Sequence, residues 1–244
     1  MASIEVAIVV WDDVVDEADV AGGVEALQAQ IDAHFADAWR VSAHLEVISL
    51  ADSRRSAWGL IVGNRDALTE RGYRDLTVGG LPLAIVEPVP GQDWTLPASR
   101  ALLQLLANPY ADLAVYDSAP PGTRELVPVQ VCAPVSSGAD AYPVRVDASR
   151  DWLVANFVFP TWYQRGPQPA PFDHLDHTSG PLEIGEHGGH VVVLDVPTGR
   201  WRVRTRAAGQ AEAAAAPLEA AGQIGLDAVR LVTTQEPDRV HLPP

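Results

Sequence analysis

The spacing of apolar residues predicts an α/β arrangement in the first part of the chain. The β-branched run Ile4–Val10 is typical of a strand buried on both faces. Apolar residues at spacings of three and four from Val24 to Phe35 then predict an amphipathic helix that ends near Trp39. Short apolar runs bounded by polar turns predict three more strands, at Leu45–Leu50, Trp58–Val62 and Leu81–Val86.

The segment 94–109 carries the clearest amphipathic pattern. Pro97 is tolerated in a first helical turn, so we expect a helix over residues 96–108. Its four leucines, at 102, 103, 105 and 106, form an apolar face. Arg100, Gln104 and Asn108 follow one another at spacings of four and form a polar stripe on the other side. This layout is typical of a helix that lines a cleft or meets solvent.

The second part of the chain is predicted to be rich in β-structure. The expected strands are Arg124–Val131, Tyr142–Val146, Trp152–Phe159, and a hairpin made of His190–Val196 and Arg200–Thr205. The segment 165–189 is rich in proline and glycine, which predicts a long ordered loop. The alanine-rich segments 210–216 and 218–232 favour helices. We therefore divide the chain into residues 1–109, 110–205 and a helical C-terminal extension at 206–244.

Composition and charge exclude several classes of function. A formal net charge of -15 argues against a nucleic-acid partner, because such binding depends on clustered Lys and Arg. All 17 basic residues are arginine, which excludes Schiff-base chemistry on lysine. The chain has neither an apolar run long enough to span a membrane nor an N-terminal signal pattern, so we expect a cytoplasmic protein without a membrane partner. The single cysteine, Cys132, allows no intrachain disulfide.

The central helix resembles the active-site helix of a bacterial family of zinc-metallopeptidase-like proteins. In that family a tryptophan precedes the pattern Ser-His-Glu-x-x-Glu-x-x-x-Asp-Pro. The matching positions here are Ser99, Arg100, Ala101, Gln104, Asn108 and Pro109. Each family residue that could bind a metal or act as a base is replaced. Arginine stays protonated and has no acceptor atom, so this helix is not expected to bind zinc.

The resemblance extends over about residues 25 to 205. Segments 72–77 and 80–83 fit the run that precedes the helix in the family. Downstream, 129–134 resembles a Glu-Val-Cys-Asp-Pro element, and 154–163 resembles a Val-Ser-Asp-Phe-Val-x-Pro-x-Trp-Phe element. The family acids correspond here to Gln130, Ala133 and Asn156. The resemblance implies an α+β, zincin-like fold, with a mixed sheet and a central cleft helix, that has lost its metal chemistry.

A metal-free site on this scaffold would use the polar stripe and nearby aromatic residues. Arg100 could bind a carboxylate, phosphate or enolate oxygen, and Gln104 could act beside it in catalysis. The residues expected to bind substrate are Trp94, Asn108, Gln130, Asn156, Trp162, Tyr163 and His174. An equally ordinary interpretation is that the aromatic residues belong to the core.

Four histidines in the long loop, at 174, 177, 187 and 190, are an alternative signal for a metal. They do not lie at the i and i+4 positions of a predicted helix. Surface or packing histidines therefore remain the simpler interpretation, and we expect no metal and no other cofactor.

Three functional hypotheses follow. The first is a metal-independent enzyme that binds a small polar or cyclic molecule, such as a cyclase or isomerase of bacterial specialised metabolism. The second is a non-catalytic pseudopeptidase that binds a peptide or protein partner in the old substrate groove. The third is a metalloenzyme whose ligands have moved to the loop histidines. A homo-oligomer formed through the C-terminal helices is a further expectation.

Overall fold

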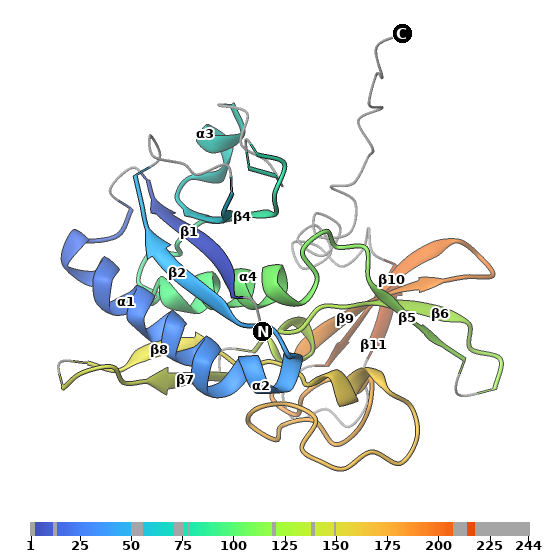
Figure 1. Cartoon of the computed structure of the whole chain (residues 1–244). Coiled ribbons are helices and arrows are strands. Elements are labelled where there is room, and N and C mark those ends of the chain that lie inside the picture. Colours follow the sequence, from blue (N-terminus) through green and yellow to red (C-terminus); the bar gives the residue numbers. More distant parts are fainter. Residues whose placement is uncertain are drawn as a thin grey trace, which may run out of the picture.

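The computed structural model describes residues 3–11, 14–49, 56–70, 76–77, 79–118, 121–137, 140–148, 150–206 and 214–217 (Figure 1). The first part of the chain alternates strands and helices. Its elements are β1 (Ile4–Val10), α1 (Glu17–Gln30), the π-helix η1 (Ile31–Phe35), α2 (Ala36–Trp39), β2 (Ala43–Val47), β3 (Trp58–Val62), α3 (Arg65–Glu70), β4 (Leu83–Val86) and α4 (Thr95–Ala107). Asp16 caps α1 by accepting a hydrogen bond from the Ala18 amide at 3.1 Å.

The first four strands form a parallel sheet in the order β2-β1-β3-β4. Successive side chains of a strand point to opposite faces, and β1 shows this directly. Val6 and Ile8 join the large core shared with α1 and α4, whereas Val9 packs with Leu68 of α3 on the other face. The two strand faces are therefore both covered, as the β-branched composition predicts.

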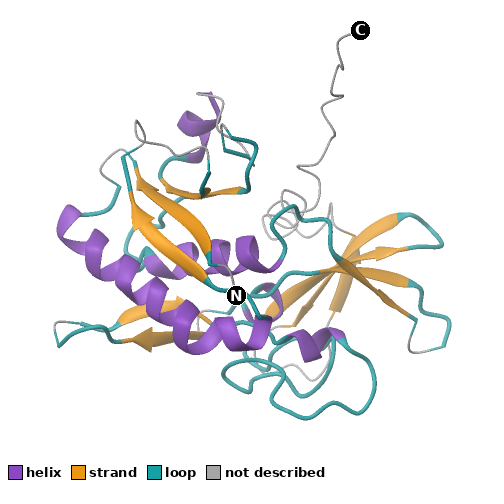
Figure 2. Ribbon diagram, viewed as in Figure 1, coloured by secondary structure: helices purple, strands orange, loops and turns teal. Residues whose placement is uncertain are grey.

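Helices α1 and α4 lie between the parallel sheet and a second, two-stranded antiparallel sheet (Figure 2). This second sheet pairs β7 (Ala141–Val144) with β8 (Trp152–Ala155). The large core runs from the parallel sheet through the helices to β7 and β8. It is continuous across the boundary that the sequence predicts at residue 109.

A five-stranded antiparallel sheet forms the other side of the molecule, in the order β11-β10-β9-β6-β5 (Figure 1). Its strands are β5 (Ala114–Asp117), β6 (Glu125–Pro128), β9 (Gly189–Asp195), β10 (Arg200–Arg206) and β11 (Ala214–Pro217). Two 3-10 turns, η3 (Ala133–Val135) and η5 (Pro160–Tyr163), lie in the connections. The segment between η5 and β9 is the long loop that the proline and glycine content predicts.

Several sequence predictions need correction. The helix predicted over 210–216 is wrong where the structure describes it, because Ala214–Pro217 is a strand paired with β10. Pairing with an existing strand edge here outweighs the helix propensity of alanine. The mixed sheet is also wrong for the described strands of the first part: all four are parallel, and the antiparallel strands lie in other sheets. The sequence analysis also missed α3 and β5. The helix predicted at 218–232 lies outside the described residues.

The paired glycines of α1 make room for two tryptophans. A Cβ placed on Gly23 would lie 2.3 Å from Cζ2 of Trp94, and one on Gly22 would lie 2.7 Å from Cζ2 of Trp152. Both indoles are buried, so neither can move aside cheaply. The glycines thus let α1 approach the start of α4 and strand β8.

We expect Gly23→Ala to destabilise the protein although alanine favours a helix. The helix-propensity gain of up to about 1 kcal/mol is smaller than the overpacking cost of about 1 to 3 kcal/mol that the clash with Trp94 implies. Thermal unfolding would measure the difference. Gly180→Ala is a suitable control, since its added Cβ would meet only the Glu183 side chain at ordinary contact distance. A Gly23→Ala protein as stable as the control would contradict this packing argument.

Candidate functional site

The polar stripe of α4 faces the β-rich part of the chain instead of open solvent. Gln104 donates from Nε2 to the Val129 carbonyl at 2.8 Å and accepts from the Val131 amide at 3.0 Å. Asn108 is buried, and its Oδ1 accepts hydrogen bonds from the amides of Asp112 and Leu113. Both side chains therefore form hydrogen bonds with main-chain groups that lack a main-chain partner within the described part of the chain. They hold the backbone at residues 112–113 and 129–131 against α4. These contacts give Gln104 and Asn108 structural roles.

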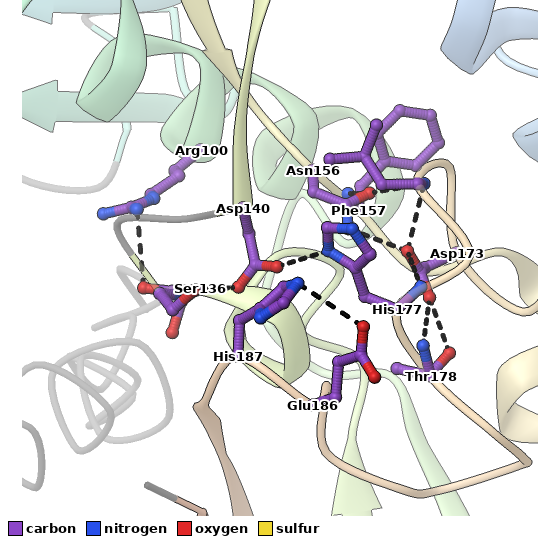
Figure 3. A network of polar contacts seen from close by, with 12 residues as sticks. Arg100, Ser136, Asp140, Asn156, Phe157, Asp173, His177, Thr178, Glu186 and His187 are labelled. Atoms are coloured by element: carbon purple, nitrogen blue, oxygen red, sulfur yellow. Dashed lines mark hydrogen bonds and ion pairs between the residues drawn. The ribbon is translucent and has the colours of Figure 1, made fainter. Parts of the chain in front are cut away.

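Arg100 differs from the other two residues of the stripe. Its Nη2 reaches the Ser136 carbonyl at 3.5 Å, and its Nε is buried with no hydrogen-bond partner among the described residues (Figure 3). The side chain is half-buried, and within that part of the chain no carboxylate forms an ion pair with it. Leaving guanidinium donors unsatisfied is costly. Among the described residues, Arg100 is therefore the member of the stripe whose donors are least satisfied.

Gln130, Trp162 and Tyr163 lie in the core behind the stripe. The Tyr163 hydroxyl accepts from the Gln130 amide at 2.9 Å, and burial raises the pKa of Tyr163. Trp162 donates from Nε1 to the Glu183 carbonyl at 2.8 Å. Gln130 keeps a buried Nε2 that has no partner among the described residues. Cys132 is buried nearby, and burial raises the pKa of its thiol to about 12, so the thiol is a packing group and not a nucleophile at neutral pH.

The carboxylate of Asp173 accepts most of the side-chain hydrogen bonds that organise residues 173–178, part of the long loop that contains the four histidines. This buried carboxylate accepts five hydrogen bonds (Figure 3). The donors are Asn156 Nδ2 at 2.7 Å, the amides of Leu175, His177 and Thr178 at 3.0, 3.2 and 2.7 Å, and the Thr178 hydroxyl at 2.7 Å. Asn156 in turn accepts from the Phe157 amide at 2.8 Å. The side chain of Asp173 therefore fixes the path of residues 173–178.

This loop places His177 against a second buried acid, Asp140. Nδ1 of His177 lies 2.7 Å from Oδ1 of Asp140, whose side chain is 1% exposed, while the imidazole is 20% exposed. The other carboxylate oxygen of Asp140 accepts from the Ser137 amide at 3.0 Å and from the Ser137 hydroxyl. A carboxylate can only accept, so Nδ1 of His177 carries a proton, and in the neutral form of the ring Nε2 is the acceptor.

His187 and Glu186 of the same loop lie near His177. The His187 ring lies edge-on to it, with ring centroids 4.5 Å apart, and His187 Nε2 is 3.4 Å from Oε1 of the exposed Glu186. In Figure 3, Asp140 lies between His177 and the Ser136 segment that Arg100 contacts. A basic residue, a buried acid and an oriented imidazole thus belong to one continuous polar network.

His174 lies apart from this network and packs in an aromatic column. Its ring stacks on His34 of η1 with centroids 4.5 Å apart, and on Phe157 at 5.4 Å. Burial lowers the pKa of His174 to about 4, with a further lowering by His34 that the charge of Asp173 opposes. Burial also lowers the pKa of His34. Both imidazoles are therefore neutral at physiological pH.

Trp94 lies at a different place from the other predicted site residues. It lines an open crevice of about 700 Å³ at the carboxyl ends of β1, β3 and β4. Arg150 bridges Asp19 and Asp93 across this crevice at 3.1 Å each. The structure therefore connects Arg100 with His177 through Ser136, Ser137 and Asp140, whereas His174 and Trp94 lie elsewhere.

Within the described residues, no three His, Cys, Asp or Glu side chains gather in a way that could hold a metal ion. No helix in that part of the chain has the length and apolar character needed to cross a bilayer. Comparisons with family models, with curated proteins and with solved structures found no match to this chain.

Sequence reasoning missed the two acids that organise the site. Asp140 follows a serine-rich turn and precedes a short strand, a context that gives no sign of burial. Asp173 lies in the pattern Asp-His-Leu-Asp-His, where the histidines drew attention as possible metal ligands. Thr178 lies five residues after Asp173. An aspartate can accept hydrogen bonds from such a nearby residue of its own loop, and this spacing was the one sequence feature that could have indicated the role of Asp173.

Proposed function

We propose that the chain is a metal-independent enzyme that performs acid–base chemistry on a small polar or cyclic molecule with an anionic group. The observation that carries this proposal is the 2.7 Å contact between buried Asp140 and the partly exposed His177. An imidazole held by a buried acid through Nδ1 offers Nε2 to a substrate as a general base. Isomerases and cyclases that act by general acid–base catalysis use such a proton transfer.

In this proposal His177 takes a proton from the substrate at Nε2 and returns it to the product. The resulting imidazolium is stabilised by the Asp140 carboxylate, so no separate cation or cofactor is required for the proton transfer. Arg100 binds the anionic group of the substrate through its half-buried guanidinium, whose contact with the Ser136 carbonyl is long at 3.5 Å. His187 lies beside His177 and would contact the substrate from the exposed side.

We further infer that the scaffold is a zincin-like one that has lost its metal ligands. What supports this is the resemblance of the α4 segment, together with the position of α4 beneath the parallel sheet. Arg100, Ala101 and Gln104 occupy the positions of the family ligands and base. The contacts of Gln104 with residues 129 and 131 replace a metal as the connection between α4 and the downstream chain.

Substitution of Arg100 tests the substrate class. Binding of small carboxylates and phosphates, screened by isothermal titration calorimetry against neutral analogues, is expected to weaken by roughly 2 to 5 kcal/mol in Arg100→Ala if the anion is desolvated. Arg100→Lys should recover part of this loss, because an ammonium cannot form the bidentate fork. Arg145→Ala is the matched control, since Arg145 forms an exposed pair with Asp151. Equal affinities for charged and neutral probes would argue against an anionic substrate.

A second candidate is peptide binding by strand addition, as a pseudopeptidase would perform it. Among the described residues β5 pairs only with β6, and its Tyr116 is 53% exposed. A Tyr116→Asp change would abolish capture of a peptide at this edge and leave binding of small anions unchanged. Unchanged peptide capture by this variant would contradict a peptide site at this edge.

A further inference from the structure

We infer that the stacked imidazoles of His34 and His174 make the proposed site acid-sensitive, because protonation of the pair would release the loop 173–178 that carries His177. The function of this device rests on the proposed role of His177. The structural change itself depends only on the contacts described below and can be measured without a substrate.

The pair joins two parts of the molecule that are distant in sequence. His34 belongs to η1, and His174 belongs to the long loop; their ring planes differ by 29° at a centroid distance of 4.5 Å. Phe157 continues the stack on the other side of His174. The aromatic column therefore attaches the loop to the helical layer beside η1.

A buried hydrogen-bond relay requires a neutral His34. Ser99 accepts from the Ala155 amide at 3.1 Å and donates to Oε1 of Gln30 at 2.7 Å, which leaves Nε2 of Gln30 to donate to the Tyr142 hydroxyl at 3.0 Å. When Nδ1 of His34 is unprotonated, Tyr142 can donate its own proton to this atom, 3.0 Å away. Protonation of His34 would leave the buried hydroxyl hydrogen of Tyr142 without its acceptor, which is costly.

The described side chains around the pair offer little compensation for a positive charge. The groups that face it are the uncharged Tyr142 of β7 and Phe157 after β8, and the acid whose charge acts on His174 is Asp173. Both oxygens of Asp173 are already occupied by donors of the loop. Within the described residues, neither imidazole forms an ion pair. A proton on one ring would also repel a proton on the other at this distance.

A displacement of His174 would also move the backbone of His177. The His174 amide donates to the Phe157 carbonyl at 3.0 Å, and the next residues donate to Asp173. His177 is only three residues away and has its imidazole on Asp140. The neutral His34–His174 pair stabilises the conformation of loop 173–178 described above, which we call closed. The closed conformation is therefore fully favoured above the ordinary histidine pKa of 6.5, and this preference is lost as the pH falls toward about 4.

Hydrogen–deuterium exchange of the His177 and Thr178 amides tests this inference. We compare wild type with His174→Phe, which keeps an aromatic ring but cannot be protonated, at the same pH so that intrinsic exchange rates cancel. At about pH 4.5 the wild type should exchange about tenfold faster than the variant, and at about pH 7.5 the two should be equal. His44→Phe, at an exposed position of β2, is the control and should follow the wild type at both values.

Equal exchange of wild type and His174→Phe at both pH values would overturn the inference. If His174→Phe fails to close the loop at neutral pH, Tyr142→Phe gives the deciding result. This substitution removes the donor that keeps His34 neutral, so the loop of the variant should open at a higher pH than the loop of the wild type. Equal pH midpoints of opening in the two proteins would contradict the relay. A failure of the proposed enzyme activity would leave these exchange results unaffected.

Discussion

Asp173→Asn is expected to lower the free energy of unfolding by about 3 kcal/mol and to detach His177 from Asp140. The carboxylate of Asp173 is buried and accepts five hydrogen bonds. An asparagine places an NH₂ group at one of the two oxygen positions, where it would face N–H donors. Loss of a buried acceptor for two or more donors accounts for a cost of this size.

Chemical denaturation near neutral pH measures this effect, and Asp176→Asn is the matched control. Asp176 is exposed and has a positive φ of 58°, a conformation that asparagine tolerates, so its replacement should change stability little. Equal denaturation midpoints for the two variants would show that the loop does not depend on the Asp173 carboxylate.

Asp140→Asn should lower turnover by about 10² to 10⁴-fold while the protein stays folded. The asparagine amide can donate to Nδ1 of His177, which would move the ring proton to Nε2 and remove the base. Nuclear magnetic resonance of the ring nitrogens reports the tautomer directly: the wild type should carry its proton on Nδ1 and the variant on Nε2. Glu186→Gln is the control, because this acid is 60% exposed and lies beside His187. An unchanged tautomer in Asp140→Asn would remove the physical basis of the expected loss.

The sequence pattern located most elements of the first part because their apolar periods are strong. β1 and β3 have the predicted bounds, and α4 begins and ends one residue earlier than predicted. Two elements were missed for identifiable reasons. The segment Arg65–Glu70 is only six residues long and is separated from the end of β3 by two residues, so its polar start is indistinguishable from a turn. β5 has only four residues and exposes Tyr116, which hides the alternation expected of a strand.

The site was harder to predict because a polar stripe does not reveal its partner. Arg100, Gln104 and Asn108 share one face of α4 as expected. Gln104 and Asn108, however, form hydrogen bonds with the backbone of residues 129 and 131. Sequence spacing cannot distinguish a stripe that meets a ligand from one that meets an unpaired segment of chain. The pairing of His177 with Asp140 joins residues 37 positions apart, which no local pattern indicates.

We expect His177 to perform proton transfer without a metal. The most direct measurement is turnover of a pooled set of small cyclic and unsaturated carboxylates and phosphates by chelator-treated protein, followed by mass spectrometry and by exchange of substrate protons with deuterated water. We predict that the treated wild type converts or exchanges at least one compound, and that His177→Gln binds this compound but does not transform it. Activity that appears only after zinc is added, or that is equal in His177→Gln, would contradict the account.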